Sequence, residues 1–162
     1  MFNEYLDSIN LIERLHRQFL EVVKGELDRL GVQDINNIQA LILYNIGKDD
    51  LTVGELTNRG YYLGSNVSYN VRKMVENDYL AQERSTHDKR SVRVRASDKG
   101  LQLWERLDEM FRRHAERMGT DSVNGTELQQ ANAVLQRLER FWNSPGAYGG
   151  ATVTGNVAGN AA

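Results

Sequence analysis

The chain has 162 residues, of which 40% are hydrophobic and 26% charged, a composition typical of a soluble globular protein. It contains no cysteine, which excludes disulfide bonds, thiolate metal sites and cysteine-based redox sensing. The net charge of −2 by itself argues against a nucleic-acid partner, but this charge is unevenly distributed.

Residues 1–58 contain five Lys or Arg and ten Asp or Glu, a net charge of −5. Residues 59–95 contain eight Lys or Arg and four Asp or Glu, a net charge of +4. Residues 96–162 have a net charge of −1. A positive segment between acidic flanks fits attraction to DNA phosphates, although an ordinary solvated basic face would give the same pattern.

Apolar residues recur at steps of three and four from Ile9 to Leu30, which predicts a long amphipathic helix over about residues 8–30. Gly31 is expected to end this helix. A second helix is expected to stop at Gly47. The residues expected to point inward from the second segment are Ile35, Ile38, Leu41, Ile42 and Ile46.

Thr52 and Glu55 have the spacing of a capping box, which predicts a short third helix through Asn58. Residues 60–64 are expected to form a turn between two glycines, and residues 65–77 a fourth helix. Its buried stripe is expected to comprise Val67, Val71, Met74 and Val75.

From Tyr79 onward the apolar period changes to alternation, which predicts strands at 80–84 and 92–95 with a polar hairpin tip at 85–91. Another long helix begins at residues 97–100, and a sixth helix follows a turn at 119–125 and reaches Trp142. Residues 143–162, rich in Gly, Ala, Asn and Thr, are expected to be a disordered tail. The inward residues of the fifth helix are expected to be Leu101, Trp104, Leu107, Phe111, Ala115 and Met118.

Two short helices joined by a tight turn and followed at once by a hairpin indicate a winged helix-turn-helix. The outward face of the fourth helix carries hydrogen-bonding side chains and two cations, which suits the major groove. Asp88 is expected to pair with Arg90 at the hairpin tip, and arginine at a narrow tip suits the minor groove. The alternatives are a solvated helix face and an edge strand protected by charge. The residues expected to contact DNA are Thr52, Ser65, Asn66, Ser68, Tyr69, Asn70, Arg72, Lys73, Asp88, Lys89, Arg90, Ser91 and Arg93.

Three segments carry a resemblance to a known family: residues 52–56 (TVGEL), residues 67–80, and residues 88–91 (DKRS) followed by 96–100 (ASDKG). They resemble the MarR regulators, over roughly residues 8–142. The resemblance implies a triangular homodimer in which the first, fifth and sixth helices of both subunits interlock. It also implies that the fourth helix enters the major groove and Arg90 the minor groove.

The same resemblance implies a small aromatic or phenolic effector, bound between the dimer helices and the DNA-binding part. Phe19, Tyr44 and Tyr62 are candidate walls of its pocket, the alternative for each being a place in the core. No cofactor is expected, and His16, His87 and His114 are too scattered to predict a metal site.

The expected fold is mainly α (α+β), with one domain over residues 1–142. Its winged-helix core is expected at about 34–97 and its dimerisation helices at about 8–30 and 98–142. Apolar surface in excess of one core, including Trp104, Phe111 and Trp142, indicates an oligomer interface. A two-fold dimer matches a palindromic operator of double-stranded DNA.

We therefore expect a dimeric, sequence-specific transcription regulator, ligand-responsive and repressing. The alternative is a winged helix that serves as a protein-interaction module without binding DNA. No nucleophile–base arrangement or phosphate-binding loop is evident, so an enzyme is not expected. The absence of a signal peptide or of a long apolar run predicts no membrane partner and a cytoplasmic protein, bacterial or archaeal, associated with the nucleoid through DNA.

Overall fold

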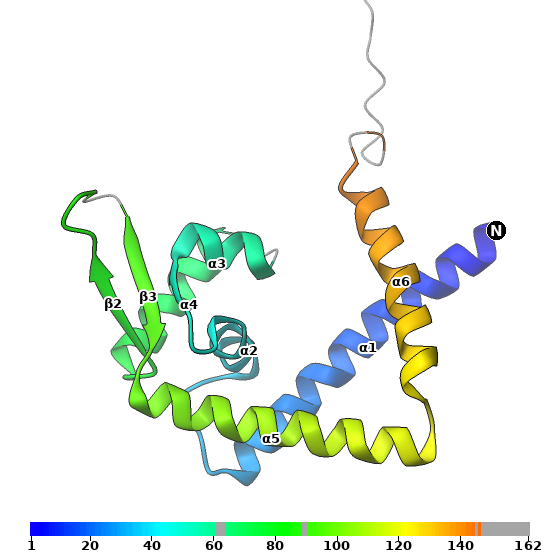
Figure 1. Cartoon of the computed structure of the whole chain (residues 1–162), viewed down its shortest axis with the longest axis horizontal. Helices are drawn as coiled ribbons and strands as arrows, with labels where there is room; N and C mark the ends of the chain where they lie inside the picture. The colour runs from blue at the N-terminus through cyan, green and yellow to red at the C-terminus, as the bar shows by residue number, and fades with distance from the viewer. Residues whose placement is uncertain (61–63, 89–90, 145, 147–162) are drawn as a thin grey trace, which may run out of the picture. The chain divides into compact units, whose positions relative to one another are not determined.

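A computed structural model describes residues 1–60, 64–88, 91–144 and 146 (Figure 1). The expected wall residue Tyr62, the pairing of Asp88 with Arg90 and nearly all of the expected tail lie outside the described residues. The chain forms two compact units, Met1–Arg113 and His114–Ala162. No helix in the described ranges is long and apolar enough to span a membrane.

The order of elements confirms the expected mainly α winged-helix fold, with one strand added. The helices are α1 (Phe2–Arg29), α2 (Asn37–Ile46), α3 (Val53–Gly60), α4 (Gly64–Glu76), α5 (Asp98–Asp121) and α6 (Gly125–Trp142). The strands are β1 (Asp50–Thr52), β2 (Leu80–Arg84) and β3 (Val92–Ala96).

α1 begins six residues before its expected start. The apolar spacing in fact continues back through Leu6 to Phe2, and the amino group of Met1 pairs with Glu4 in the first turn. At the other end, Gly31 adopts a left-handed φ of 70°, and the amide of Val32 donates to the carbonyl of Leu27. This is the glycine-terminated helix end that the sequence predicts.

α2 differs from its expected face at one residue. Asn36 and Gln39 cap the helix reciprocally, and Gly47 ends it with a φ of 58°. Ile38, expected to point inward, is 42% exposed. It lies in the first turn of α2 and lines an open cleft, so its side chain is only partly covered.

The short strand β1 was not predicted. It pairs antiparallel with β3, which makes a three-stranded sheet in the order β1-β3-β2. A three-residue strand directly before a helix is too short to show alternation, so its sequence contains no recognisable signal. Because β3 is the central strand, Val94 is fully buried, while Arg93 and Arg95 face outward.

α5 turns a different face to the core from the one predicted. Leu103, Leu107 and Met110 are buried, whereas Ala115 and Met118 are exposed. The predicted apolar stripe mixed residues from two faces of α5. Trp104 and Phe111 belong to the second face, where they are half-buried and pack on Tyr44 of α2. The helix also runs to Asp121, into the expected turn, and Asn124 then caps α6. Leu101, also expected to point inward, is half-buried, and Phe111 packs against the edge of the core.

A junction at Tyr79 joins α4, α5 and the loop between α1 and α2. The Tyr79 hydroxyl donates to Asp34 at 2.6 Å, and Lys99 donates to the same carboxylate at 2.8 Å. The Lys99 ammonium also lies 4.2 Å from the centre of the Tyr79 ring. The Lys99 and Tyr79 hydrogen bonds lower the pKa of Asp34, while burial and then Asp34 raise the pKa of Tyr79. Asp34 therefore remains charged and Tyr79 protonated at neutral pH.

A second polar clamp joins α1 to α5. Glu26 is 7% exposed and accepts two hydrogen bonds from Arg29, at 2.8 and 2.7 Å, and one from Arg113 at 3.2 Å. The hydrogen bond from Arg29 is the main cause that lowers the pKa of Glu26, and Arg113 adds to it. Two guanidinium groups thus hold a buried carboxylate in its charged form.

Gly100→Ala is expected to destabilise the protein by about 1–3 kcal/mol, because a side chain there would overpack the junction. A Cβ at this position would lie 2.1 Å from the carbonyl oxygen of Tyr79. Urea denaturation measures the effect. Gly119→Ala in the same helix, with no atom within 4 Å of the added Cβ, is the control and should be neutral or stabilising by up to about 1 kcal/mol. Equal stabilities of both variants would contradict the close packing at Gly100.

Glu26→Gln is expected to cost about 1–2 kcal/mol of stability at pH 7, because the guanidinium groups lose a charged acceptor. Since the folded-state pKa of Glu26 lies below the ordinary 4.5, its contribution is complete above about pH 4.5 and is lost as the pH falls further. Denaturation measured from pH 7 down to pH 3 should therefore show the two proteins converging. The exposed Glu109, paired with Arg106, provides the control Glu109→Gln, which should change little at any pH.

Candidate DNA-binding surface

α3 is held in place by its first and last residues. The Thr52 hydroxyl accepts from the amide of Glu55 at 3.1 Å, and the Glu55 carboxylate accepts from the amide of Thr52 at 2.7 Å. The predicted capping box is therefore present, and its hydrogen bonds lower the pKa of Glu55. At the other end, Arg59 donates to Asp49 at 2.7 Å and to the carbonyl of Asn45 at 3.1 Å.

α4 turns Val67, Val71 and Met74 into the core. This burial fixes the rotation of the helix, so the residues between them form its outward face. The half-buried Lys73 donates to Glu76 at 2.9 Å. The described side chains that are exposed on this face, among those expected to contact DNA, are Asn66, Ser68, Tyr69 and Arg72.

The side chain of Arg72 is free to bind a partner, whereas that of Asn70 is already hydrogen-bonded within the fold. Arg72 is exposed and has no ion-pair partner in the described part of the chain, so its guanidinium remains available. Asn70 accepts from the amide of Gln39 at 3.1 Å and donates to the carbonyl of Asn66 at 2.8 Å. Its amide therefore connects α4 to α2.

The wing is the β2–β3 hairpin beside α3 and α4 (Figure 1). The amide of Ser91 donates to the carbonyl of Asp88 at 3.0 Å, which tightens the tip. Arg93 donates to Asp50 of β1 twice, at 3.0 Å to the carboxylate and 2.6 Å to the carbonyl. Arg93 therefore fastens the edge strand to the wing, whereas Lys89 and Arg90 lie outside the described residues.

A cleft of about 830 Å³ lies among α1, α2, α3, α4 and α5 within the first unit. Both described candidates for the effector pocket, Phe19 and Tyr44, line it. Asn66, Tyr69 and Asn70 line it as well, so one helix contributes both to this cleft and to the outward face. The sequence did not predict this overlap, because spacing along α4 shows that three residues share a face but not which helices lie opposite.

An aromatic cluster forms one wall of the cleft. Tyr44 stacks on Trp104 with centroids 5.6 Å apart and meets Phe111 edge-on at 4.8 Å. Phe19 stacks on Phe111 at 5.9 Å. Trp104 and Phe111, expected among the apolar surplus for an interface, thus have partners within their own unit.

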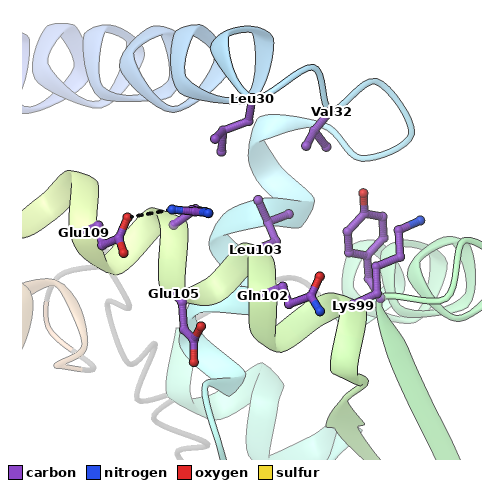
Figure 2. Close-up of a pocket in the computed structure, with 9 residues that line it drawn as sticks. Leu30, Val32, Lys99, Gln102, Leu103, Glu105 and Glu109 are labelled. Atoms are coloured by element: carbon purple, nitrogen blue, oxygen red, sulfur yellow. Dashed lines mark hydrogen bonds and ion pairs between the residues drawn. The ribbon is translucent and has the colours of Figure 1, made fainter.

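A second cleft of about 560 Å³ lies between the end of α1 and the start of α5. Figure 2 shows Leu30 and Val32 on one side and Leu103 with Lys99 on the other. Each cation that lines it is already paired, Lys99 with Asp34 and Arg106 with Glu109. Gln102 and Glu105 add polar side chains, but Tyr79 is the one aromatic residue among the described residues that line it, so the first cleft is the stronger candidate for an aromatic effector.

A helix-turn-helix followed by a wing on a three-stranded sheet is the architecture of winged-helix DNA-binding proteins. Residues 33–91, from the start of the loop before α2 to the wing, match the model of the MarR family. The chain is 37% identical over 145 residues to the exopolysaccharide II synthesis transcriptional activator ExpG of Rhizobium meliloti strain 1021, covering 90% of this chain and 75% of that protein. The chain belongs to the MarR family of DNA-binding transcription regulators, which are not enzymes.

Solved structures of regulators share the fold. A cysteine-to-serine mutant of Escherichia coli MarR in complex with operator DNA superposes with a TM-score of 0.69 at 18% identity, over 85% of this chain and 97% of that one. Staphylococcus aureus MarR in complex with salicylate and kanamycin superposes with a TM-score of 0.69 at 20% identity, over 86% of this chain and 92% of that one. At these identities the likeness establishes the fold.

Arg72→Ala is expected to change sequence preference, because a free arginine on the outward face is suited to paired hydrogen bonds with guanine. Discrimination at one operator position should fall by about tenfold or more, measured by competition binding with single-base operator variants. Lys73→Ala is the matched control. Its ammonium is held by Glu76, so a small loss, uniform across sequences, is expected. A uniform loss for Arg72→Ala as well would make that residue a phosphate contact.

Proposed function

We propose that this chain acts as a homodimer on a palindromic operator, as a repressor released by a small aromatic or phenolic effector. One domain over residues 1–142 would perform this, with the winged-helix core at about 34–97 and dimerisation helices at about 8–30 and 98–142. The protein acts in the cytoplasm, associated with nucleoid DNA. The observation that carries the proposal is the shared α4, whose Asn66 and Tyr69 belong to both the exposed outward face and the cleft.

The residues expected at the DNA fall into two groups: those that contact DNA directly and those that hold the contacting residues in position. Ser65, Asn66, Ser68, Tyr69 and Arg72 meet the major groove from α4, and Arg90 reaches the minor groove with Lys89 beside it. The other expected residues act through the geometry they maintain, since their side chains or backbones are engaged within the fold. These positioning residues are Thr52, Asn70, Lys73, Asp88, Ser91 and Arg93.

Dimerisation is supported by apolar side chains that a single chain leaves exposed. α1 buries Val23 and Leu27 near its end, but Leu15 is 53% exposed and Phe19 39%. α6 has no buried residue in the described chain, although it is amphipathic. Such apolar stripes are stable in water when a second copy covers them. The exposed large apolar residues of α1 and α6 are Phe2, Leu6, Leu11, Leu15, Phe19, Val22, Leu128, Val134, Leu135 and Phe141.

Effector response is supported by the composition of the cleft wall. A molecule between Phe19 and Tyr44 would also contact Asn66, Tyr69 and Asn70, which α4 needs in a fixed position on DNA. A coupling of about 1–3 kcal/mol between the two ligands changes DNA affinity by roughly 5- to 150-fold, enough to release an operator. The related S. aureus MarR was solved with two small molecules bound, which supports such a site in the family.

Activation is the second candidate, favoured by the relative that is named a transcriptional activator. A reporter fused to the regulated promoter separates the two. Deletion of the gene should raise transcription if the chain represses and lower it if the chain activates.

Arg90→Ala is expected to weaken operator binding while leaving the dimer intact. Its guanidinium would no longer enter the minor groove, so the dependence of log affinity on log salt should become shallower by about one counterion per subunit. Gel shifts on the DNA upstream of the chain's own gene, from low to moderate salt, measure both quantities. Analytical ultracentrifugation measures whether the variant remains a dimer.

Arg106→Ala provides the control, since this arginine pairs with Glu109 on α5, away from the sheet and α4. It should leave affinity and salt slope unchanged. Unaltered binding by Arg90→Ala would remove the wing from the DNA contacts, and salt-insensitive or absent binding by the unmodified chain would favour a protein-interaction module.

A further inference from the structure

The cleft beside α4 has a mainly apolar lining that also contains several neutral polar groups. No Lys, Arg, Asp or Glu occurs among the described residues that line it. His16 is the single lining side chain, within the described ranges, that is able to carry a positive charge. The remaining polar groups are carboxamides and phenols, contributed by Asn36, Asn45, Asn66, Asn70, Tyr44 and Tyr69.

The apolar part of the lining favours a flat ring. Phe19 and Phe111 stack with 25° between their planes, and Tyr44 presents its ring edge-on to Phe111. Leu41 and Ile42 add aliphatic surface from α2. An aromatic molecule would extend this cluster with stacked or edge-on contacts, each worth more than its buried area alone.

The hydrogen-bonding groups in the lining suit a neutral ligand. The Tyr44 hydroxyl donates its proton to Asp108 at 3.0 Å, so toward a ligand its oxygen can act only as an acceptor. Burial and the Asp108 carboxylate both raise the pKa of Tyr44, which keeps this phenol protonated. Asn36 uses its side-chain oxygen to cap α2, and its NH₂ group has no partner in the described chain. The wall thus presents both a neutral acceptor and a neutral donor.

A carboxylate would meet unfavourable electrostatics in the same place. Entering the cleft removes water from the anion, and burial of a charge is costly unless a cation replaces that water. Arg112 does not supply one, because it donates to Asp108 at 2.7 Å. Asp108 and Arg112 compensate each other's charge, so neither offers a free cation to a carboxylate that approaches the Tyr44 hydroxyl.

We propose that this cleft selects an uncharged, hydrogen-bonding aromatic effector and rejects carboxylates of the same shape. The inference rests on the proposed function in taking the cleft as the effector site. It adds the chemical class of the ligand, an amide- or phenol-bearing ring, and the cause of the selection, which is the missing cation in the lining.

Two isosteric probes test it: 3-hydroxybenzamide, which is neutral, and 3-hydroxybenzoate, which is an anion at neutral pH. Calorimetric titration of the full chain should give at least about tenfold tighter binding of the amide, a difference of about 1.4 kcal/mol. His16→Gln should keep the same order of affinities, because the selection does not depend on an imidazole charge. Phe19→Ala should weaken the amide by about tenfold, which places the probe in this cleft.

A gain-of-function variant tests the cause. Ile38 lines the cleft, yet is 42% exposed, so Ile38→Arg introduces a cation at the rim without opening the core. It should raise 3-hydroxybenzoate affinity by about tenfold or more relative to the matched neutral variant Ile38→Gln, since the carboxylate then gains a charged partner. Amide binding should change little between the two variants.

Three results would overturn the proposal in distinguishable ways. Equal or tighter binding of 3-hydroxybenzoate to the unmodified chain would refute the selectivity and leave the cleft as the effector site. Binding of neither probe, with operator binding intact, would refute the effector site together with its selectivity. An amide affinity unaffected by Phe19→Ala would place the probe at another site.

Discussion

The junction at Tyr79 is the constraint on which the rest of the DNA-binding part depends. α4 ends there with Asp78 in a left-handed conformation and the amide of Tyr79 donating to the carbonyl of Met74. The Tyr79 carbonyl then accepts from the amide of Ser97, at the start of α5. Only a glycine at position 100 leaves room for this carbonyl. The end of α4 and the beginning of α5 are thus fixed to each other through backbone atoms, which no side-chain rotamer change relaxes.

The polar groups around this junction satisfy the buried Tyr79 hydroxyl from the partly exposed side chains of Asp34 and Lys99. Asp34 accepts from both Tyr79 and Lys99, and Lys99 also donates to the carbonyl of Asn77. Every buried side-chain nitrogen and oxygen in the described part of the chain has a hydrogen-bond partner. A connection of this kind fixes the start of α5 relative to the end of α4.

Most of this architecture was predictable because its signals are local. The Thr52–Glu55 capping box, the glycine ends of α1 and α2, and the alternation in β2 and β3 each depend on residues within a few positions. What could not be predicted depends on partners far apart in the sequence. β1 exists because β3 pairs with it, and Ile38 is exposed because it lines an open cleft. Arg93 and Asn70 bind Asp50 and Gln39 across more than thirty positions. The same limit applies to the cleft, whose described walls come from five helices, α1 to α5.

Gln39 shows how the cleft and the reading helix share one set of hydrogen bonds. It is buried, its side-chain oxygen accepts from the amide of Asn36 at 3.1 Å, and its side-chain nitrogen donates to Asn70. Asn70 in turn donates to the carbonyl of Asn66, one turn earlier on α4. Asn36, Asn66 and Asn70 all line the cleft, so an effector bound as proposed would compete with contacts that hold α4 against α2. Because a buried amide that loses its partner costs roughly 1–3 kcal/mol, the exchange of one such bond is of the size that operator release requires.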